Sequence, residues 1–355
     1  RGPETGDQKV VSYLLEQGQI RLVLSSALNA DHAIARDVAL HGDTLAVLAF
    51  EVTDVEHVYR QIQHKLALNE LRPELGAMLQ LQPPTVQVDT SGELKTTELQ
   101  VFGNVSLKFI ERSTYDGYFA PYFIASSAAQ HAAQGNAYNV ATTVAQPLPQ
   151  LQAIDHVVAN VEAGAMDKWV QCFEVLLGFE LVAHFDQQMI TTGNSALASK
   201  VVQTAAGQIK IPINEPAVGK RASQIQEFLD YHAGPGIQHV AFKTQNIIES
   251  VRQLRAAGVQ FLTVPATYYA ALPERISPLP RPLAELAELG ILVDRDRDGY
   301  LLQIFTQPVG DRPTLFFEII ERQGSQGFGE GNFNALFAAI EREQARRGHL
   351  GVIYK

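Results

Sequence analysis

The sequence predicts an α+β fold in which a unit of one strand, one helix and several further strands recurs along two halves of the chain. Three observations support this prediction. Short segments of the first half reappear in the second half in the same order, which indicates an internal duplication. Apolar runs of strand length alternate with amphipathic stretches of helical period. The 355 residues, 46% of them hydrophobic and 19% charged, suffice for two domains with sizeable cores.

The duplication rests on three matched pairs of segments. The first pair reads as an apolar strand, a polar turn and the start of a helix, with an offset of 241 − 49 = 192. The second pair closes each half with an offset of 315 − 105 = 210, so the later copy has a longer insertion. One match alone is weak, but three in the same order favour duplication. The pairs are residues 49–55 with 241–247, 105–112 with 315–322, and 18–24 with 207–213.

The second half contains the pattern twice. In its first unit, Gly178 is a suitable C-cap for the expected helix, and in its second unit Gly258 follows the helix. Gly, Pro and Asp residues separate the strands of both units. The expected strands are residues 154–161, 180–185, 198–203, 208–213, 237–243, 299–305 and 314–321, and the expected helices are residues 169–177 and 248–257.

Charge and cysteine content exclude several classes of protein. Lys and Arg minus Asp and Glu is 28 − 38 = −10, and the acidic residues are scattered, which argues against a surface for nucleic acid or for an anionic membrane. Cys172 is the single cysteine, so an internal disulfide framework and a zinc site with two cysteines are excluded. No stretch of 18 apolar residues predicts a transmembrane helix, and a reducing, cytoplasmic location is expected.

Three polar residues lie within apolar strands of the second half. His156 and His239 each stand in the first strand of a unit, and Glu318 stands in the last strand. The spacings, 239 − 156 = 83 and 318 − 239 = 79, fit one position per unit. A buried carboxylate is costly unless it is paired or binds a metal. Two imidazoles and one carboxylate on one face leave open coordination positions, as in non-haem Fe(II) oxygenases.

The first half serves as an internal control for this interpretation. Val47 occupies the position equivalent to His239, and Lys108 occupies the position equivalent to Glu318. A single strand histidine is more often a core residue than a ligand. A purely structural role, however, would not explain why only one copy of the repeat contains these residues. We therefore expect Fe(II) to bind in the second half.

The two halves are expected to form two domains. Residues 1–148 are the N-terminal, non-catalytic domain, and residues 149–355 are the C-terminal, catalytic Fe(II) domain. Pro147 and Pro149 mark the junction as a linker. Ser12 in the first unit matches Ser199 in the third, but too few residues precede Ser12 for a strand and a helix. The first unit is therefore expected to be incomplete, and the chain to be part of a longer protein.

Five longer motifs resemble the 4-hydroxyphenylpyruvate dioxygenase family. The resemblance extends from residue 2 to the end of the chain and is densest from residue 154 onward. It implies a vicinal-oxygen-chelate fold of tandem βαβββ units that form two open barrels. It also implies Fe(II) on His156, His239 and Glu318. The motifs are residues 212–216, 223–229, 236–239, 301–305 and 328–337.

The resemblance further implies a reaction and a pocket. The substrate would be 4-hydroxyphenylpyruvate, which O2 converts into homogentisate and CO2 by decarboxylation, ring hydroxylation and side-chain migration. Homodimers or homotetramers are usual in the family. Gln238 is expected to contribute least, because neighbouring strand residues point to opposite faces. The implied polar pocket residues are Ser199, Asn214, Gln224 and Gln303; the implied aromatic walls are Phe305, Phe328 and Phe333; and Asn332, Phe337 and Gln238 complete the substrate-binding set.

Three alternatives remain open. The nearest is 4-hydroxymandelate synthase, which resembles this family in fold, iron site and substrate but hydroxylates the benzylic carbon; Asn214 and Phe337 favour the dioxygenase. The others are a metal-free binding protein and an inactive paralogue. A final helix is also expected, because Asn332 is a suitable N-cap and apolar residues follow at helical spacing. We expect this helix to close the cavity.

Overall fold

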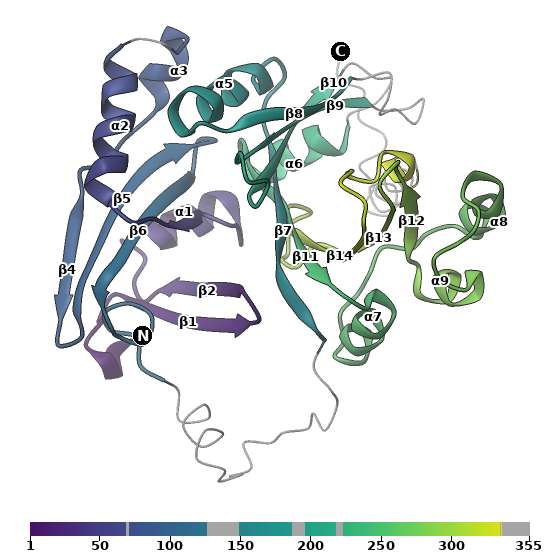
Figure 1. Cartoon of the computed structure of the whole chain (residues 1–355). Helices are drawn as coiled ribbons and strands as arrows, with labels where there is room; N and C mark the ends of the chain where they lie inside the picture. The colour runs from purple at the N-terminus through teal and green to yellow at the C-terminus, as the bar shows by residue number, and fades with distance from the viewer. Residues whose placement is uncertain (69–70, 126–148, 187–195, 218–222, 334, 336–355) are drawn as a thin grey trace.

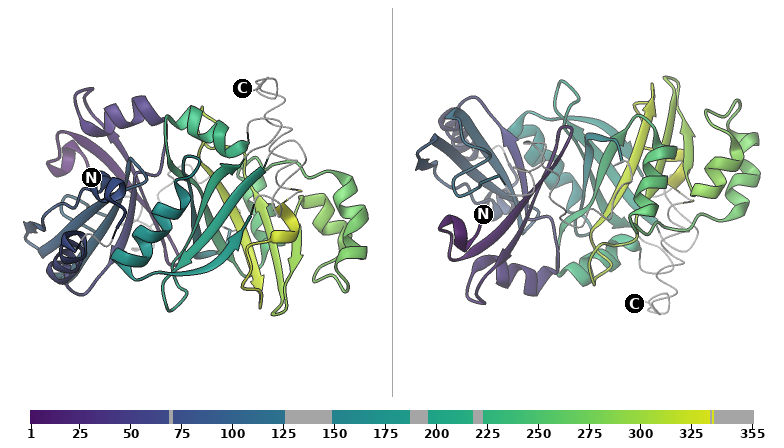
Figure 2. Two further views of the ribbon diagram at one scale, coloured as in Figure 1. Left: turned by 90° about the horizontal axis from the view of Figure 1, so that it is seen from above. Right: turned by 90° about the horizontal axis from the view of Figure 1, so that it is seen from below.

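The structure, a computed structural model, describes residues 1–68, 71–125, 149–186, 196–217, 223–333 and 335. It has the α+β vicinal-oxygen-chelate fold that the sequence predicts (Figure 1). The sheets of the first half lie at one end of the molecule, and helices α8 (Ala266–Arg275) and α9 (Leu283–Leu289) lie at the other end (Figure 2). No helix among these residues has both the length and the apolar character needed to cross a membrane.

The second half forms one eight-stranded sheet with the order β12-β13-β14-β11-β7-β10-β9-β8. Each unit contributes a first strand, then a helix, α5 (Met166–Leu177) or α7 (Ile247–Ala256), then three strands of which the last pairs in parallel with the first. The first strands of the two units pair in the centre of the sheet. The strands are β7 (Leu151–Asn160), β8 (Glu180–Phe185), β9 (Ala196–Gln203), β10 (Lys210–Ala217), β11 (Gly236–Thr244), β12 (Leu292–Arg295), β13 (Tyr300–Phe305) and β14 (Phe316–Gln323).

The first half forms a four-stranded sheet with the order β3-β6-β5-β4 and a separate hairpin of β1 and β2. In the second half, β7 separates β10 from β11, but no strand of the described residues stands between β2 and β3. The expectation that a longer protein supplies further elements stays a prediction. The elements are β1 (Val10–Gln17), β2 (Ile20–Ala27), α1 (Ala33–His41), β3 (Val47–Glu51), α2 (Val55–Ala67), α3 (Pro73–Met78), β4 (Thr85–Asp89), β5 (Gly92–Val101) and β6 (Val105–Tyr115).

Strand pairing in the two halves follows the offsets of the repeat. Ala49 in β3 pairs with Lys108 in β6, and Ala241 in β11 pairs with Glu318 in β14. These partners differ by 241 − 49 = 192 and 318 − 108 = 210 residues, the two offsets found in the sequence. The copies therefore share the pairing register as well as the order of elements.

A glutamate near the end of the last strand makes the same contact in both copies. Glu111 in β6 accepts a hydrogen bond from the backbone N–H of Val55, at 3.0 Å, at the start of α2. Glu321 in β14 accepts one from the backbone N–H of Ile247, at 2.8 Å, at the start of α7. A carboxylate there satisfies an otherwise unpaired helix N–H and complements the positive end of the helix dipole. Each copy thus ties its helix to its last strand.

Four elements of the second half were not predicted, and the strands expected at residues 208–213 and 314–321 each begin two residues later in the structure. Helix α6 (Gln224–His232) begins after Ser223, whose Oγ accepts from the Gln226 N–H, while α8 contains Pro273 and α9 is short. Such helices, like the four-residue β12, are too short or interrupted to show a clear period. The strand expected at residues 208–213 is β10, which begins two residues later and extends further.

The two halves share a hydrophobic core. Phe102 of the first half packs its ring against Trp169 and Phe173 of α5, with ring centroids 4.9 Å and 5.6 Å apart. All three side chains are fully or almost fully buried. Burial of this extent stabilises by about 1.5–3 kcal/mol per large apolar side chain. The division into domains at residues 148 and 149 stays a prediction, and Pro147 lies outside the described residues.

Polar contacts also join the halves at the C-terminal ends of α1 and α6. The Arg312 guanidinium donates to the carbonyl oxygens of Leu40, at 2.6 Å, and Tyr231, at 3.1 Å. His41 Nδ1 donates to the carbonyl oxygen of His232 at 2.6 Å. Cations and N–H donors at these helix ends satisfy carbonyl groups that have no partner within the helix. Helix α6, which begins with Gln224, is thereby braced by the first half.

These contacts predict that the metal-free protein loses stability in mild acid. Burial, assisted by His41 and Arg312, lowers the pKa of His232 to about 4 from 6.5. In the unfolded chain His232 therefore binds a proton below about pH 6.5, whereas in the folded protein it does so only near pH 4. As the pH falls from 6.5 to 4, the unfolding free energy should fall by roughly 2–3 kcal/mol. Urea unfolding at pH 6.5 and pH 4.5 measures this loss within the window between the two pKa values of His232.

The matched variant for this prediction is His232→Gln, which cannot titrate. Its unfolding free energy should depend less on pH than that of the unsubstituted protein over the same window. Thr44 Oγ1, which donates to the neutral ring Nε2 at 2.9 Å, can donate to the glutamine oxygen instead. An identical pH dependence in both proteins would contradict the assignment to His232.

Candidate metal centre

The strand register brings three polar side chains to one face of the sheet. Ala241 in β11 pairs with His156 across β7 and with Glu318 across β14. Residues in one lateral row point to the same face, and so does His239, two positions before Ala241 in the same strand. His156, His239 and Glu318 therefore converge, although 162 residues (318 − 156) separate the first from the last.

The three side chains are close enough for one ion to contact all of them. Glu318 Oε2 lies 3.2 Å from His156 Nε2 and 3.5 Å from His239 Nε2, and the three candidate ligand atoms lie within 4.8 Å of one another. All three residues are buried, Glu318 to 3% exposure. Two imidazoles and one carboxylate suit a divalent transition metal.

Each histidine is oriented by the residue that precedes it. His156 Nδ1 donates to Asp155 Oδ1 at 2.9 Å, and His239 Nδ1 donates to Gln238 Oε1 at 3.1 Å. These bonds place the proton on Nδ1 and leave the Nε2 lone pair for a metal. The donor set therefore fits a metal ion.

A β-bulge before each histidine makes these contacts feasible. The pairing of β7 with β11 skips Gln238 on one strand and Asp155 on the other. A bulge breaks the alternation of faces and redirects a side chain. The expectation that Gln238 points away from His239 is therefore wrong, because strict alternation does not hold at this position.

The pKa values reflect attraction among buried groups. Burial raises the pKa of Glu318, but His156 and His239 outweigh it and leave that pKa below its usual value. Burial lowers the pKa of His156, but attraction to Glu318 and Asp155 outweighs burial and raises that pKa to about 9. The metal-free site thus holds a proton between imidazole and carboxylate, and a metal must displace such a proton to bind.

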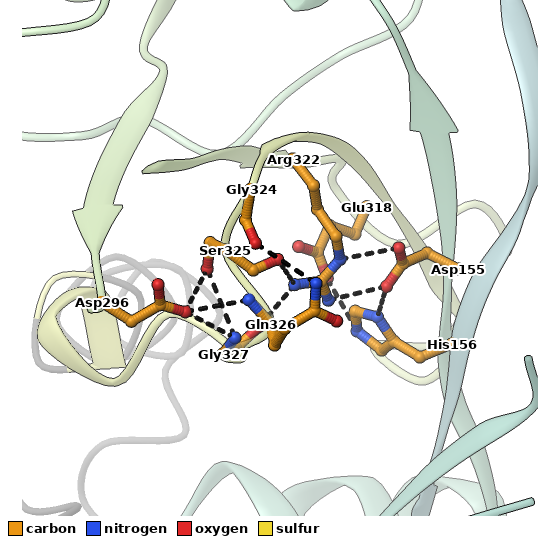
Figure 3. Close-up of polar contacts among 9 residues, drawn as sticks. All are labelled: Asp155, His156, Asp296, Glu318, Arg322, Gly324, Ser325, Gln326 and Gly327. Carbon is orange, nitrogen blue, oxygen red and sulfur yellow. Dashed lines mark hydrogen bonds and ion pairs between the residues drawn. The ribbon is translucent and has the colours of Figure 1, made fainter. Parts of the chain in front are cut away.

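Asp155 also forms a buried ion pair behind His156 (Figure 3). Arg322 Nε and Nη2 donate to the two Asp155 oxygens, both at 2.8 Å, in a bidentate pair. Arg322 Nη1 donates to the carbonyl oxygen of Gly327 at 2.6 Å. The contact thus continues from the histidine through Asp155 and Arg322 to the segment that follows β14.

The four predicted polar pocket residues are buried on different elements. Ser199 in β9 pairs with Asn214 in β10, and the Asn214 amide donates to Asn160 Oδ1 at 3.3 Å. Gln224 is the first residue of α6 and, with Gln238, lines a small pocket beside Phe316. Gln303 lies in β13, 1% exposed. The Oε1 atoms of Gln224 and Gln303 have no hydrogen-bond partner among the described residues.

The predicted aromatic residues divide between the triad and its surroundings. The rings of Phe328 and His156 are nearly perpendicular, with centroids 5.5 Å apart, and those of Phe305 and His239 are nearly perpendicular at 6.1 Å. Phe333 instead packs against Phe185, at 5.5 Å. Phe316, which was not predicted, stacks on His239 at 4.7 Å.

Asn332 is fully buried, and its Oδ1 accepts from Tyr268 Oη, at 2.8 Å, and Arg275 Nη2, at 3.0 Å. Its Nδ2 has no partner among the described residues. Phe337 and the expected final helix lie outside them. Asp155 and Arg322 were also missed, although the polar residue before each histidine was a visible signal.

The first half has a different pair at the equivalent position. Lys108, equivalent to Glu318, lies beside Glu98 of β5, with Nζ 2.8 Å from Oε1. Glu98 faces Lys108 across the sheet as Phe305 faces Glu318. An ammonium–carboxylate pair thus replaces an aromatic wall and a candidate ligand.

The fold and this site define a member of a large metal-binding superfamily. Residues 153–304 match the glyoxalase, bleomycin resistance protein and dioxygenase superfamily. A mutant of 4-hydroxymandelate synthase from Streptomyces coelicolor superimposes with a TM-score of 0.77 and 31% sequence identity, covering 96% of this chain and 89% of that one.

Comparison with individual proteins identifies the family within this superfamily. The 4-hydroxyphenylpyruvate dioxygenase of Yarrowia lipolytica is 40% identical, with 99% of this chain and 86% of the relative covered. Those of Dictyostelium discoideum and Danio rerio are 38% and 39% identical, with 98% and 99% of this chain and 91% and 85% of the relatives covered. The chain belongs to the 4-hydroxyphenylpyruvate dioxygenase family.

Proposed function

We propose that this protein is a non-haem Fe(II) dioxygenase that converts 4-hydroxyphenylpyruvate and O2 into homogentisate and CO2. The observation that carries the proposal is the buried triad of His156, His239 and Glu318. It stands in a chain that aligns over nearly its whole length with 4-hydroxyphenylpyruvate dioxygenases. Iron suits this ligand set because two histidines and one carboxylate leave positions for a chelating substrate and O2.

Bound Fe(II) would supply a binding site for the keto acid oxygens and the electrons that activate O2. The chain's own residues hold the metal ligands in place and orient the substrate. Asp155 and Gln238 fix the two histidines through their Nδ1 protons. Phe328 and Phe305 flank the histidines and restrict where an aromatic ring can lie. Holding the reacting groups in this geometry lowers the barrier by removing unproductive orientations.

The unpaired polar atoms support the substrate's chemistry. A buried oxygen without a donor costs about 1–3 kcal/mol, so Gln224 Oε1 and Gln303 Oε1 favour a ligand that donates hydrogen bonds. A phenol hydroxyl is such a donor. We further assign Ser199, Asn214, Asn332 and Gln238 to the proposed binding set as its other polar members, and Phe333 and Phe337 as its remaining aromatic members.

The rival function is that of 4-hydroxymandelate synthase, because a structure of that enzyme superimposes well on this chain. The two reactions share a substrate and differ in the carbon that is hydroxylated. Asn214 in β10 favours the dioxygenase, since the synthase tends to have an aliphatic residue there.

Product analysis tests the proposal. Protein loaded anaerobically with Fe(II) and then given 4-hydroxyphenylpyruvate and O2 should release homogentisate and CO2. 4-Hydroxymandelate as the main product would favour the synthase. A protein that binds no iron and consumes no O2 with this substrate would be a binding protein or an inactive paralogue. Iron-free protein treated in the same way is the control.

The proposal includes assembly and location. We expect a homodimer or homotetramer, as is usual in the family. We also expect a cytoplasmic location without nucleic-acid or membrane partners, given the net charge of −10 and the single cysteine, which is buried. Sedimentation of the iron-loaded protein measures the oligomeric state, and a monomer at micromolar concentration would contradict this expectation.

A further inference from the structure

We propose that Arg322 is a positioning residue that locks the metal ligand His156 and the pocket segment after β14 into one arrangement. The inference rests on the proposed metal centre. Arg322 and Glu318 are four residues apart on β14 and therefore project from the same face. The same face of β14 thus presents the metal ligand Glu318 and, two positions further along that face, Arg322, which binds the partner of the ligand His156.

The first arm of this contact leads to the metal. Asp155 receives two hydrogen bonds from Arg322 and one from His156, and the side chains of Asp155 and Arg322 are only 4% and 7% exposed. A carboxylate held from both sides cannot rotate, so the His156 imidazole plane is fixed. Outer partners of this kind typically contribute 10–100-fold to metal affinity.

The second arm leads to the pocket wall. Arg322 Nη1 holds the carbonyl oxygens of Gly327, at 2.6 Å, and Ser325, at 3.3 Å, and its guanidinium lies 5.7 Å from the centroid of the Phe328 ring. Phe328 in turn faces His156. One guanidinium therefore sets the position of both the ligand and the aromatic ring beside it.

Asp296 anchors the same segment from the opposite side (Figure 3). Its Oδ2 accepts from Ser325 Oγ, at 2.7 Å, and from the backbone N–H groups of Gln326 and Gly327, both at 2.9 Å. Within the described part of the chain, Asp296 forms no hydrogen bond or ion pair with Asp155 or with the triad. Asp296 therefore reaches the segment without touching the metal ligand or Asp155, so its replacement perturbs the second arm more directly than the first.

The repeat supplies a matched control. Arg112 is the first-half equivalent of Arg322, since 322 − 210 = 112. It also donates to a carbonyl oxygen after its strand, that of Phe119, and lies over the Phe119 ring at 5.0 Å. Its nearest carboxylate is Glu51 at 3.9 Å, and the first half has no triad among the described residues. Holding the following segment is thus common to both copies, and the link to a metal ligand belongs to one.

The experiment compares Co(II) affinity, measured by competition with a chelator, and O2 consumed per homogentisate released. Arg322→Gln and Asp155→Asn should each weaken Co(II) binding about 10–100-fold. The double variant should bind Co(II) no more weakly than whichever single variant binds it less tightly. Arg322→Lys, which keeps the charge but not the fork, should recover part of the affinity. Asp296→Asn should keep Co(II) affinity and raise O2 consumed per homogentisate.

Arg112→Gln should lower the unfolding free energy as Arg322→Gln does, without weakening Co(II) binding. The inference is overturned if Arg322→Gln binds Co(II) like the unsubstituted protein, or if Arg112→Gln weakens binding equally. Affinity losses of Arg322→Gln and Asp155→Asn that multiply in the double variant would also overturn it. If the unsubstituted protein binds metal but forms no homogentisate, the proposed function fails while the affinity comparison still decides the role of Arg322.

Discussion

Glu318→Gln is expected to reduce turnover below detection and to weaken metal binding by more than the ~100-fold that outer partners contribute. The amide is nearly the same size as the carboxylate but supplies no negative charge to the metal. Both histidines would then face a cation without its anionic ligand. Binding of Co(II) or Fe(II) to the purified variant, and product formation by the loaded protein, measure the two effects.

Glu321→Gln is the matched control for this prediction. Glu321 lies on the same strand, is equally buried and contacts the start of α7 instead of the triad. Its replacement should cost about 1–3 kcal/mol of stability, because it weakens both the helix cap and the ion pair with Arg281, and it should leave metal binding intact. Equal losses of metal affinity in both variants would indicate that burial, and not the ligand set, accounts for the effect.

Gly329→Ala is expected to lower kcat/KM by about 100-fold, because displacing a positioning group by an ångström can cost that much. Gly329 has a φ of +81°, and an added Cβ would come within 2.4 Å of Gln303 Oε1. Gln303 is buried and would have to move to make room. Steady-state kinetics of the iron-loaded variant test this expectation.

Backbone strain and side-chain displacement can be separated here. Gly178 ends α5 with a similar φ of +69°, but an added Cβ would meet no atom within 4 Å. Gly178→Ala should therefore show the cost of a left-handed alanine, about 1–2 kcal/mol, with unchanged kinetics. The double variant Gly329→Ala with Gln303→Ala should be no slower than Gln303→Ala alone. A slower double variant would show that Gly329 acts by another route.

The fold was largely predictable because the repeat made the sequence its own reference. Offsets of 192 and 210 between segments reappear as the pairing of Ala49 with Lys108 and of Ala241 with Glu318. Polar residues in apolar strands stood out for the same reason, since only one copy had them. The triad could therefore be chosen before any geometry was known.

The surroundings of the triad were less predictable. A bulge adds one residue without changing the apolar pattern, so Gln238 was assigned to the wrong face, and the contact of Asp155 with His156 was not expected. Arg322 meets Asp155 only because two strands distant in sequence approach, which no local spacing encodes. Helices α8 and α9 were not predicted, because Pro273 interrupts the apolar period of α8 and α9 has only seven residues.

The Lys108–Glu98 pair suggests how the two copies diverged after duplication. In the first copy the charged amine of Lys108, and not a metal ion, pairs with a carboxylate, so this contact with Glu98 forms without a metal. Reversal is not a single step: Lys108→Glu alone would set two carboxylates opposite each other, which is destabilising. Natural selection would have to remove Glu98 first and lose the pair without yet gaining a ligand. Because at least two substitutions are needed, the exchange of charge helps to keep catalysis in one copy.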